Sequence, residues 1–338
     1  MGKLPRGKLR NDALERLVLP YTGREDGRVI QGPRTGFDAA VIDHGTDYMV
    51  VATDPTLDVP QETIGFFAYH FAVSDVTVFG ADPVWLVVDV LLPPESDERL
   101  LGSITSAIHW ECLRYGGTIV GGHTGVYEAL KTPVVTTTAM GLVRKEDLKL
   151  PLARPGDAIV VTDKVGLEFA VMAAYLDGDL EDSLGREAVR KLRRLYVDET
   201  SVPDALTARG LVRGMHDATE GGLTALHEIA DNSGLGFVVS RERIPVRDIV
   251  REVLELHGVD PITVSSSGTL IAITPPENVE ELLDRFRKAG IGAAEIGRFT
   301  DDGKRVLINN GHEKMFPEFM EDPYTRLIGR GWGEDRED

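Results

Sequence analysis

An aspartate, Asp75, lies in the middle of an apolar segment, 64–79, whose apolar residues have helical spacing and which ends at Gly80. Burying a carboxylate inside an apolar helix is costly unless the group is paired or binds a metal ion. The segment therefore predicts a helix that packs into the protein and carries a functional acid. The alternative is that Asp75 lies on an exposed stripe of this helix.

Strand-like and helix-like segments alternate along the 338 residues, without a dinucleotide-binding fingerprint or a Walker-type phosphate loop. This alternation predicts a layered α/β or α+β enzyme fold. Prolines and charges between 145 and 157 place a domain boundary near residue 150. We expect strands at 39–42, 48–52, 85–92, 118–120, 134–143, 158–162, 236–239 and 269–274, and helices at 11–19, 64–79, 97–115, 167–175, 186–199, 223–232, 249–257 and 279–289.

The charge balance and the cysteine count limit the kind of protein this is. Lys and Arg number 37 and Asp and Glu 55, giving a net charge of −18, which disfavours nucleic acid or an anionic membrane as the main partner. The single cysteine, Cys112, excludes an internal disulfide framework and fits a reducing compartment. No run of about 18 apolar residues and no secretory signal is visible. We therefore expect a cytoplasmic protein that spans no membrane.

Two aspartates in the first half flank expected strands. Asp38 precedes the strand at 39–42, and Thr53-Asp54-Pro55 follows the strand at 48–52. Ligands of layered α/β proteins tend to lie beyond strand ends, and carboxylate and hydroxyl oxygens are ligands that Mg²⁺ accepts. The alternative for both aspartates is a turn residue that bonds its own backbone.

Glycine-rich and hydroxyl-rich segments supply further candidates. Gly121-Gly122-His123-Thr124 follows a short strand, and glycines there let the backbone approach a phosphate, although His123 alone would suit a plain turn. The segment 217–223 precedes a helix, where Asp217 or Thr219 could cap it or an anion could bind. The segment 265–270 is either a substrate contact or an ordinary loop.

Taken in order, these segments resemble the aminoimidazole-ribonucleotide (AIR) synthase superfamily, which includes AIR synthetase, thiamine-monophosphate kinase, selenophosphate synthetase and the hydrogenase maturation protein HypE. The resemblance runs from about residue 30 to 325. It implies an α+β, two-domain fold, with an N-terminal extension at 1–30, a first domain to residue 150, a second domain at 151–330 and an acidic tail at 331–338. It also implies that the N-terminal sheet pairs with its twin in a homodimer. ATP and Mg²⁺ would lie in a cleft lined by both domains. The segments that carry it are Asp38–Val41, Thr53-Asp54, Ser74-Asp75, Gly80–Pro83, Gly121–Thr124, Asp217–Leu223 and Ser267–Leu270.

The resemblance also assigns roles residue by residue. It implies Mg²⁺ ligands at Asp38, Asp54 and Asp75, with Thr53 assisting, and a second metal and nucleotide cluster at Asp217, Thr219 and Glu220. Nucleotide contacts would come from Gly121, Gly122, His123 and Thr124, and Arg144 could reach a phosphate. Asp54, Asp75 and His123 are the expected catalytic residues.

Some features depart from the family pattern. His123 stands where most members carry an acid, so it could remove a metal ligand, replace it with nitrogen, contact phosphate or act in acid/base chemistry. HypE modifies a cysteine at its own C-terminus, whereas this sequence ends in Gly331–Asp338. Glu220 differs from the Asp-Pro-Thr-Arg pattern of HypE and is closer to thiamine-monophosphate kinase.

We therefore expect a HypE-like, ATP- and Mg²⁺-dependent enzyme that phosphorylates or activates a small-molecule substrate without the C-terminal cysteine chemistry. One alternative is a kinase of the thiamine-monophosphate type. Another is a nucleotide-binding partner, without turnover, in a maturation complex.

Overall fold

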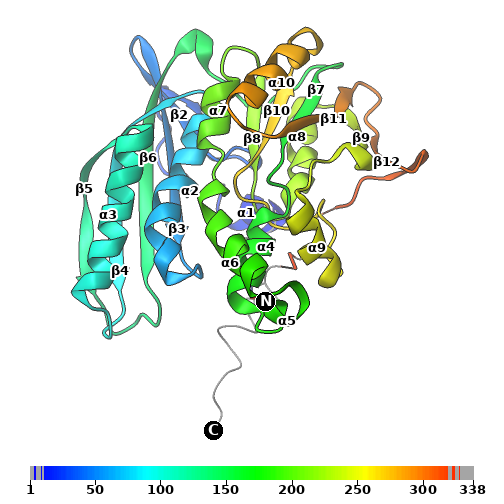
Figure 1. The fold of residues 1–338 in the computed structure, drawn as a ribbon. Coiled ribbons are helices and arrows are strands. Elements are labelled where there is room, and N and C mark those ends of the chain that lie inside the picture. Colours follow the sequence, from blue (N-terminus) through cyan, green and yellow to red (C-terminus); the bar gives the residue numbers. More distant parts are fainter. Residues whose placement is uncertain (1–3, 5–8, 10, 319–321, 324–326, 328–338) are drawn as a thin grey trace.

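The computed structural model describes residues 4, 9, 11–318, 322–323 and 327, so the acidic tail at 331–338 lies outside the described residues. The described chain contains two β-sheets with helices packed against them (Figure 1). This arrangement confirms the α+β, two-domain fold expected from the sequence. Within the described residues, no helix has the length and apolar character needed to cross a membrane.

The first sheet has six strands and carries helices α2 and α3. The helix α1 (Asn11–Leu17) precedes it in the chain. The face of the sheet against the helices is apolar and buried, as Val50, Ala52, Val135 and Ala139 illustrate. In spatial order the strands are β1 (Val29–Gln31), β2 (Ala40–His44), β3 (Asp47–Thr56), β6 (Val134–Arg144), β4 (Asp82–Leu92) and β5 (Thr118–Val126), and the helices are α2 (Ile64–Val78) and α3 (Glu98–Tyr115).

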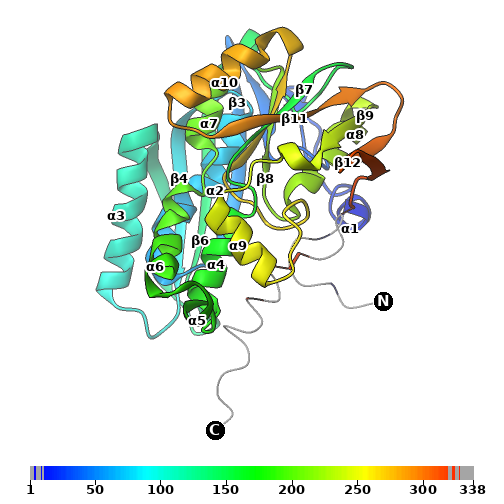
Figure 2. The same cartoon turned by 45° about the vertical axis from the view of Figure 1, so that its right-hand side comes forward.

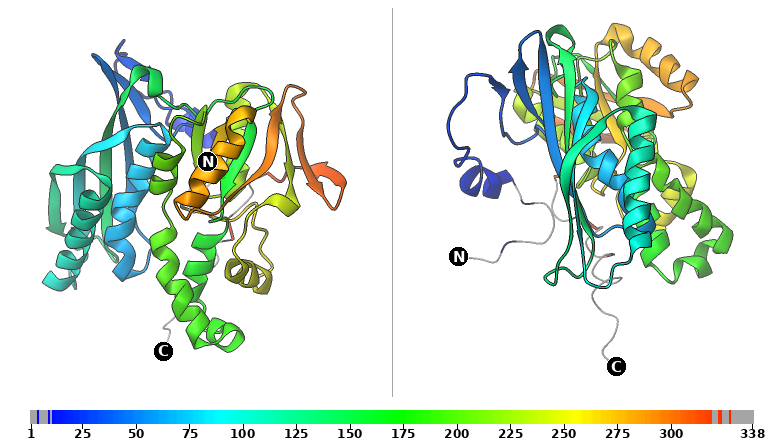
Figure 3. Two further views of the ribbon diagram at one scale, coloured as in Figure 1. Left: turned by 45° about the horizontal axis from the view of Figure 1, so that its top comes forward. Right: turned by 90° about the vertical axis from the view of Figure 1, so that its left-hand side faces the viewer.

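The helix α2 lies between the first sheet and the second domain, as Figures 1 and 3 show. On one side it contacts β3 and β6, and on the other it contacts α7 (Val202–Ala208) and β8 (Gly214–Ala218). Because it is covered on both sides, α2 is apolar around its whole circumference. Its central position explains why Asp75 is buried and not on an exposed stripe.

The second sheet has seven strands, all antiparallel to their neighbours except β12 beside β9. Its spatial order is β13 (His312–Met315), β12 (Arg305–Asn309), β9 (Gly236–Ser240), β11 (Ala293–Thr300), β7 (Ala158–Thr162), β10 (Thr269–Thr274) and β8. Its other helices are α4 (Leu167–Leu176), α5 (Leu180–Leu184), α6 (Arg186–Arg194), α8 (Ala225–Ser233), α9 (Asp248–Leu256) and α10 (Val279–Lys288).

Two predictions about strand ends were wrong. The strand β3 continues through Thr53, Asp54 and Pro55 to Thr56, although the sequence predicted that it ends at Ala52. Pro55 is tolerated because β2 pairs with β3 only as far as Val51, so that among the described residues β3 has a neighbouring strand at Pro55 on one side, β6.

The glycine segment is the second case: β5 runs from Thr118 to Val126, so Gly121–Thr124 lies inside a strand and not in a turn. At Gly122, φ is +151° and a Cβ would lie 1.8 Å from the carbonyl oxygen of Val88. The glycine is therefore needed for the close pairing of β5 with β4.

Candidate active site at the domain junction

Four aspartates from both domains converge at one place. Asp54 lies on the helix-covered face of β3, Asp75 on α2, Asp38 just before β2, and Asp217 on β8. Burial raises the pKa of Asp75 well above its usual value, and the nearby carboxylates of Asp54, Asp217 and Asp38 raise it further. A site with this many carboxylates in contact favours a cation.

A histidine and a glutamate that the sequence did not single out join this cluster. His216 on β8 is buried, and its Nε2 lies 3.5 Å from Asp38 Oδ2 and 3.7 Å from Glu228 Oε2 on α8. Burial lowers the pKa of His216, but Asp38, Glu228 and Asp217 outweigh burial and raise it to about 10. In the metal-free protein the imidazolium therefore offsets part of the negative charge.

The segment 11–36, which includes α1, lies against the part of the second domain that contains α8 (Figure 2). Asn11 of α1 donates a hydrogen bond of 3.2 Å from Nδ2 to Glu228 Oε1. Asn232 of α8 donates to the carbonyl oxygen of Thr35, 3.1 Å away. At Gly36, where φ is +77°, a Cβ would lie 2.9 Å from the Cβ of Glu228. The segment that leads to Asp38 is thereby fixed against α8.

The segment Gly121–Thr124 lies on the edge strand β5, in register with the part of β3 that carries Asp54 but three strands away from it. Asp54 pairs with Thr137 on β6, Thr137 with Val88 on β4, and Val88 with Gly122 on β5. Three strand spacings separate Asp54 from Gly122, or about 14 Å. Thr124, two residues further along β5, shares the face of Gly122. Within one chain, this segment and the aspartates are therefore apart.

Thr53, Gly121 and His123 lie on the opposite face of the sheet, because neighbouring residues of a strand point to opposite sides. Thr53 Oγ1 is 2.9 Å from Thr138 Oγ1, and His123 Nε2 is hydrogen-bonded to the Tyr127 hydroxyl. Neither side chain is brought to the four aspartates of the same chain.

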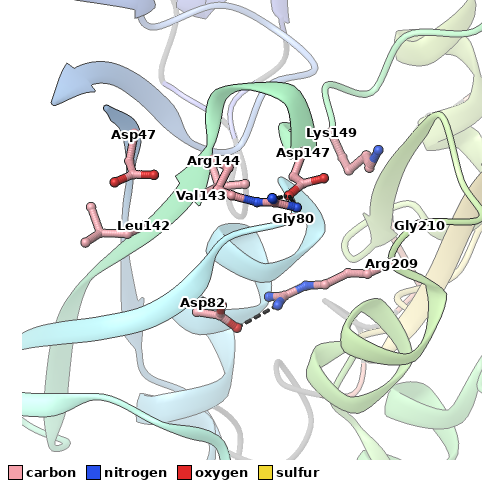
Figure 4. Close-up of a pocket in the computed structure, with 10 residues that line it drawn as sticks. All are labelled: Asp47, Gly80, Asp82, Leu142, Val143, Arg144, Asp147, Lys149, Arg209 and Gly210. Atoms are coloured by element: carbon pink, nitrogen blue, oxygen red, sulfur yellow. Dashed lines mark hydrogen bonds and ion pairs between the residues drawn. The ribbon is translucent and has the colours of Figure 1, made fainter. Parts of the chain in front are cut away.

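Arg144 also lies apart from the aspartates. It pairs with Asp47 at the other end of β3, roughly 24 Å along the strand from Asp54. Its guanidinium forms ion pairs with Glu146 and Asp147. Arg144 and Asp147 line a pocket of about 430 Å³ between the domains (Figure 4). In the same pocket Arg209 binds Asp82, with 2.6 Å between Nη1 and Oδ1.

Thr219 and Glu220 lie beside a second acidic group. The carbonyl oxygen of Thr219 accepts hydrogen bonds from the backbone N–H groups of Gly222 and Ser266, which hold the turn after β8. Burial raises the pKa of Glu168 to about 7, and the carboxylates of Asp322 and Glu220 contribute to the rise. The Ser267 backbone N–H, 2.9 Å from Glu168 Oε2, partly opposes this effect.

Comparison with known proteins follows the same division into two domains. Residues 36–143 match the AIR synthase related protein N-terminal domain, and residues 154–309 match the C-terminal domain of the same family. The chain belongs to the AIR synthase related family. Asp38, Asp54 and Asp75 lie within the first of these family domains, and His216, Asp217 and Glu228 within the second.

Within this family the chain is HypE-like, as the sequence resemblance predicted. Carbamoyl dehydratase HypE of Azotobacter vinelandii is 32% identical over 270 residues, which are 77% of this chain and 77% of the relative. A crystal structure of hydrogenase maturation protein HypE in complex with ATP has a TM-score of 0.66 at 24% identity and covers 95% of this chain and 98% of its own. The structure of AaThiL complexed with AMPPCP and TMP has a TM-score of 0.68 at 19% identity and covers 84% and 90%.

Proposed function

We propose that this protein is an ATP- and Mg²⁺-dependent enzyme that phosphorylates or activates a small-molecule substrate. The observation that carries the proposal is the convergence of Asp38, Asp54, Asp75 and Asp217 at the junction of the two domains. Divalent ions held by these carboxylates would neutralise the triphosphate oxygens and stabilise the charge of phosphoryl transfer. The ATP complex of the HypE relative and the AMPPCP complex of AaThiL support a nucleotide at this fold.

Asp54 and Asp75 are the proposed catalytic metal ligands, because they lie on the regular elements β3 and α2 and their carboxyl groups interact directly. Thr219 and Glu220 are proposed to serve the nucleotide and a second ion from the turn after β8. We assign no phosphate contact to Arg144 in this site, since it is engaged by Glu146 and Asp147 at the other end of β3.

The protein is further proposed to be a homodimer. On the helix-free face of the first sheet the strands carry apolar side chains that are only partly buried. A second copy packed on this face would cover them. Thr53, Gly121 and His123 share this face, so they would meet the partner's surface. The apolar residues concerned are Ile42, Met49, Val51, Val87, Leu91, Val134, Met140 and Leu142.

Modification of a cysteine of the protein itself, as in HypE, is not part of the proposal. The sequence has one cysteine, Cys112, and burial raises the pKa of its thiol to about 11, which makes it a poor nucleophile. The second candidate function, a kinase of the thiamine-monophosphate type, is favoured by the fold similarity to AaThiL and by the acid at Glu220.

The test is thermal denaturation with ATP, with and without Mg²⁺, combined with ADP release in the same sample. A ligand at about 100 times its dissociation constant adds about 2.7 kcal/mol to the free energy of unfolding. We expect a shift that requires Mg²⁺, together with slow ADP release that a substrate accelerates. A Mg²⁺-dependent shift without turnover on any candidate substrate would favour the nucleotide-binding partner of a maturation complex. Absence of any nucleotide-dependent shift would refute the proposal.

A further inference from the structure

One ring nitrogen of His216 is directed into the aspartate cluster without a hydrogen-bond partner. The other nitrogen, Nδ1, lies 2.6 Å from the carbonyl oxygen of Asp217 and donates to it, because a carbonyl oxygen can only accept. Nε2 is buried and makes no hydrogen bond, since Asp38 Oδ2 at 3.5 Å and Glu228 Oε2 at 3.7 Å are too distant. The imidazole is therefore oriented by its backbone contact, with Nε2 toward the carboxylates.

We propose that His216 Nε2 is a direct ligand of a divalent transition-metal ion, bound together with Asp38 and Asp217 and with Glu228 beside them. The inference deepens the proposed function and rests on it, because Asp38 and Asp217 belong to the same nucleotide–metal site. It adds a nitrogen ligand, and with it a preference among metals.

The positions of the atoms fit one ion. Ligand atoms of Asp38, His216 and Asp217 all lie within 4.8 Å of one another, with Asp38 Oδ2 3.5 Å from His216 Nε2 and Asp217 Oδ1 3.8 Å from His216 Nδ1. For an ion with bonds of about 2.1 Å, adjacent ligand atoms are roughly 3 Å apart and opposite ones roughly 4 Å. Small side-chain rotations would therefore close the three groups on an ion. Two of them come from the second domain and Asp38 from the first, so the ion would join the domains.

The surroundings of His216 are those of a metal-binding histidine. Such a histidine almost always donates its second ring N–H to a carbonyl or carboxylate, which fixes the tautomer and the ring orientation. The carbonyl oxygen of Asp217 does this here. Glu228 is oriented in turn by Asn11, whose Nδ2 donates to Oε1 and leaves Oε2 on the side of His216.

The nitrogen ligand determines the metal preference. Mg²⁺ favours an all-oxygen octahedral shell, whereas imidazole suits the later first-row ions and raises their affinity relative to Mg²⁺. The site should accordingly bind Mn²⁺, Co²⁺ or Zn²⁺ more tightly than Mg²⁺. Replacing His216 should reduce this preference more than it reduces Mg²⁺ binding.

The test uses the full-length protein loaded with one equivalent of Mn²⁺ in the absence of nucleotide, so that no adenine nitrogen is present. Pulsed electron paramagnetic resonance detects a nitrogen bound to Mn²⁺, and labelling the protein with ¹⁵N-histidine identifies it as imidazole. We expect a nitrogen coupling that changes with the label and is absent from His216→Gln. The variant should bind Mn²⁺ at least about tenfold more weakly and Mg²⁺ with little change. His109→Gln, at an exposed position on α3, is the matched control and should keep both properties.

Mn²⁺ bound without a histidine coupling, or an unchanged coupling in His216→Gln, would overturn the inference. So would failure of Mn²⁺ to bind at all. These outcomes are distinct from failure of the proposed function, which is measured on the wild-type protein by its Mg²⁺-dependent response to ATP. Unfolding of each variant, followed by circular dichroism, separates loss of the ligand from loss of the fold.

Discussion

His70 of α2 and Thr200, two residues before α7, form a buried hydrogen bond of 2.7 Å between the His70 Nδ1 and the Thr200 hydroxyl, and this bond links the two domains. Burial lowers the pKa of His70, so its ring is neutral and the other nitrogen donates to Glu111 on α3. The carbonyl oxygen of Thr200 accepts a hydrogen bond of 2.7 Å from Lys164, whose ammonium pairs with Asp204. The helix that carries Asp75 is thereby held against the domain that carries Asp217.

Replacing Thr200 with valine should weaken this link. The change removes the hydroxyl that donates to His70 and accepts from the backbone N–H of Val202. Leaving these buried groups without a partner should lower the free energy of unfolding by about 1–3 kcal/mol, measured by urea denaturation. Thr105→Val, at an exposed position on α3, is the control and should change stability little. Equal effects of the two substitutions would contradict a role for the link.

In the absence of metal, Asp75→Asn should stabilise the protein. The pKa of Asp75 is raised above its unfolded value, so its folded-state proton is favoured and stability falls as the pH rises above about 4. An amide has no charge to bury, so the variant should gain about 1–3 kcal/mol at pH 8. Melting in EDTA measures the gain, and Asp301→Asn, in an exposed turn, is the control. A less stable variant in EDTA would refute this electrostatic interpretation.

A second buried acid gives a prediction with a defined pH range. Burial raises the pKa of Glu168 from 4.5 to about 7, so the folded protein keeps a proton that the unfolded chain loses. Stability from this group therefore falls as the pH rises from 4.5 to about 7. Glu168→Gln removes the titration but keeps an oxygen for the Ser267 N–H. Between those pH values the variant should gain up to about 3 kcal/mol over wild type in urea denaturation. If the free energies of unfolding of wild type and Glu168→Gln changed in parallel with pH, the buried titration of Glu168 would be contradicted.

The two glycines of β5 should respond differently to alanine. Gly122→Ala would place a Cβ 1.8 Å from the Val88 carbonyl oxygen at a φ of +151°, so we expect a loss of about 1–3 kcal/mol or more. Gly121 has no atom within 4 Å of an added Cβ, so Gly121→Ala should change stability by less than about 0.5 kcal/mol. If Gly121 contacts the nucleotide in a dimer, its variant should instead weaken ATP binding. Similar stability losses in both variants would contradict this interpretation.

Sequence reasoning anticipated much of the fold but only part of the site. The apolar segment around Asp75 predicted a buried helix because an acid in such surroundings needs a polar site. His216 and Glu228 were missed because each resembles an ordinary polar residue in its own segment, and only the contact of β8 and α8 with the N-terminal domain gives them a common place. The strand at 118–126 was cut short because glycine lowers β-propensity, and pairing with β4 overrides that preference.

Several strands were also missed for physical reasons. The strand β8 carries His216 and Asp217 in fully buried positions, so its hydrophobic pattern is interrupted where the site requires polar groups. The short β12 and β13 lie at the edge of the second sheet and have mostly exposed or partly exposed residues. The roles assigned to the aspartates, to Glu220 and to His123 stay predictions that mutagenesis must test.

The most direct test of a metal–nucleotide site at the domain junction is calorimetric titration of ATP into wild type and Asp54→Asn, with Mg²⁺ and with EDTA. Among the neighbouring carboxylates, Asp54 contributes most to the raised pKa of Asp75, and an asparagine of the same shape cannot supply its charge. We expect binding to wild type only with Mg²⁺, and affinity at least about tenfold lower in a folded Asp54→Asn, as loss of a charged contact implies. Equal affinity in the two proteins, or binding to wild type in EDTA with the affinity seen in Mg²⁺, would show that ATP does not bind through this cluster.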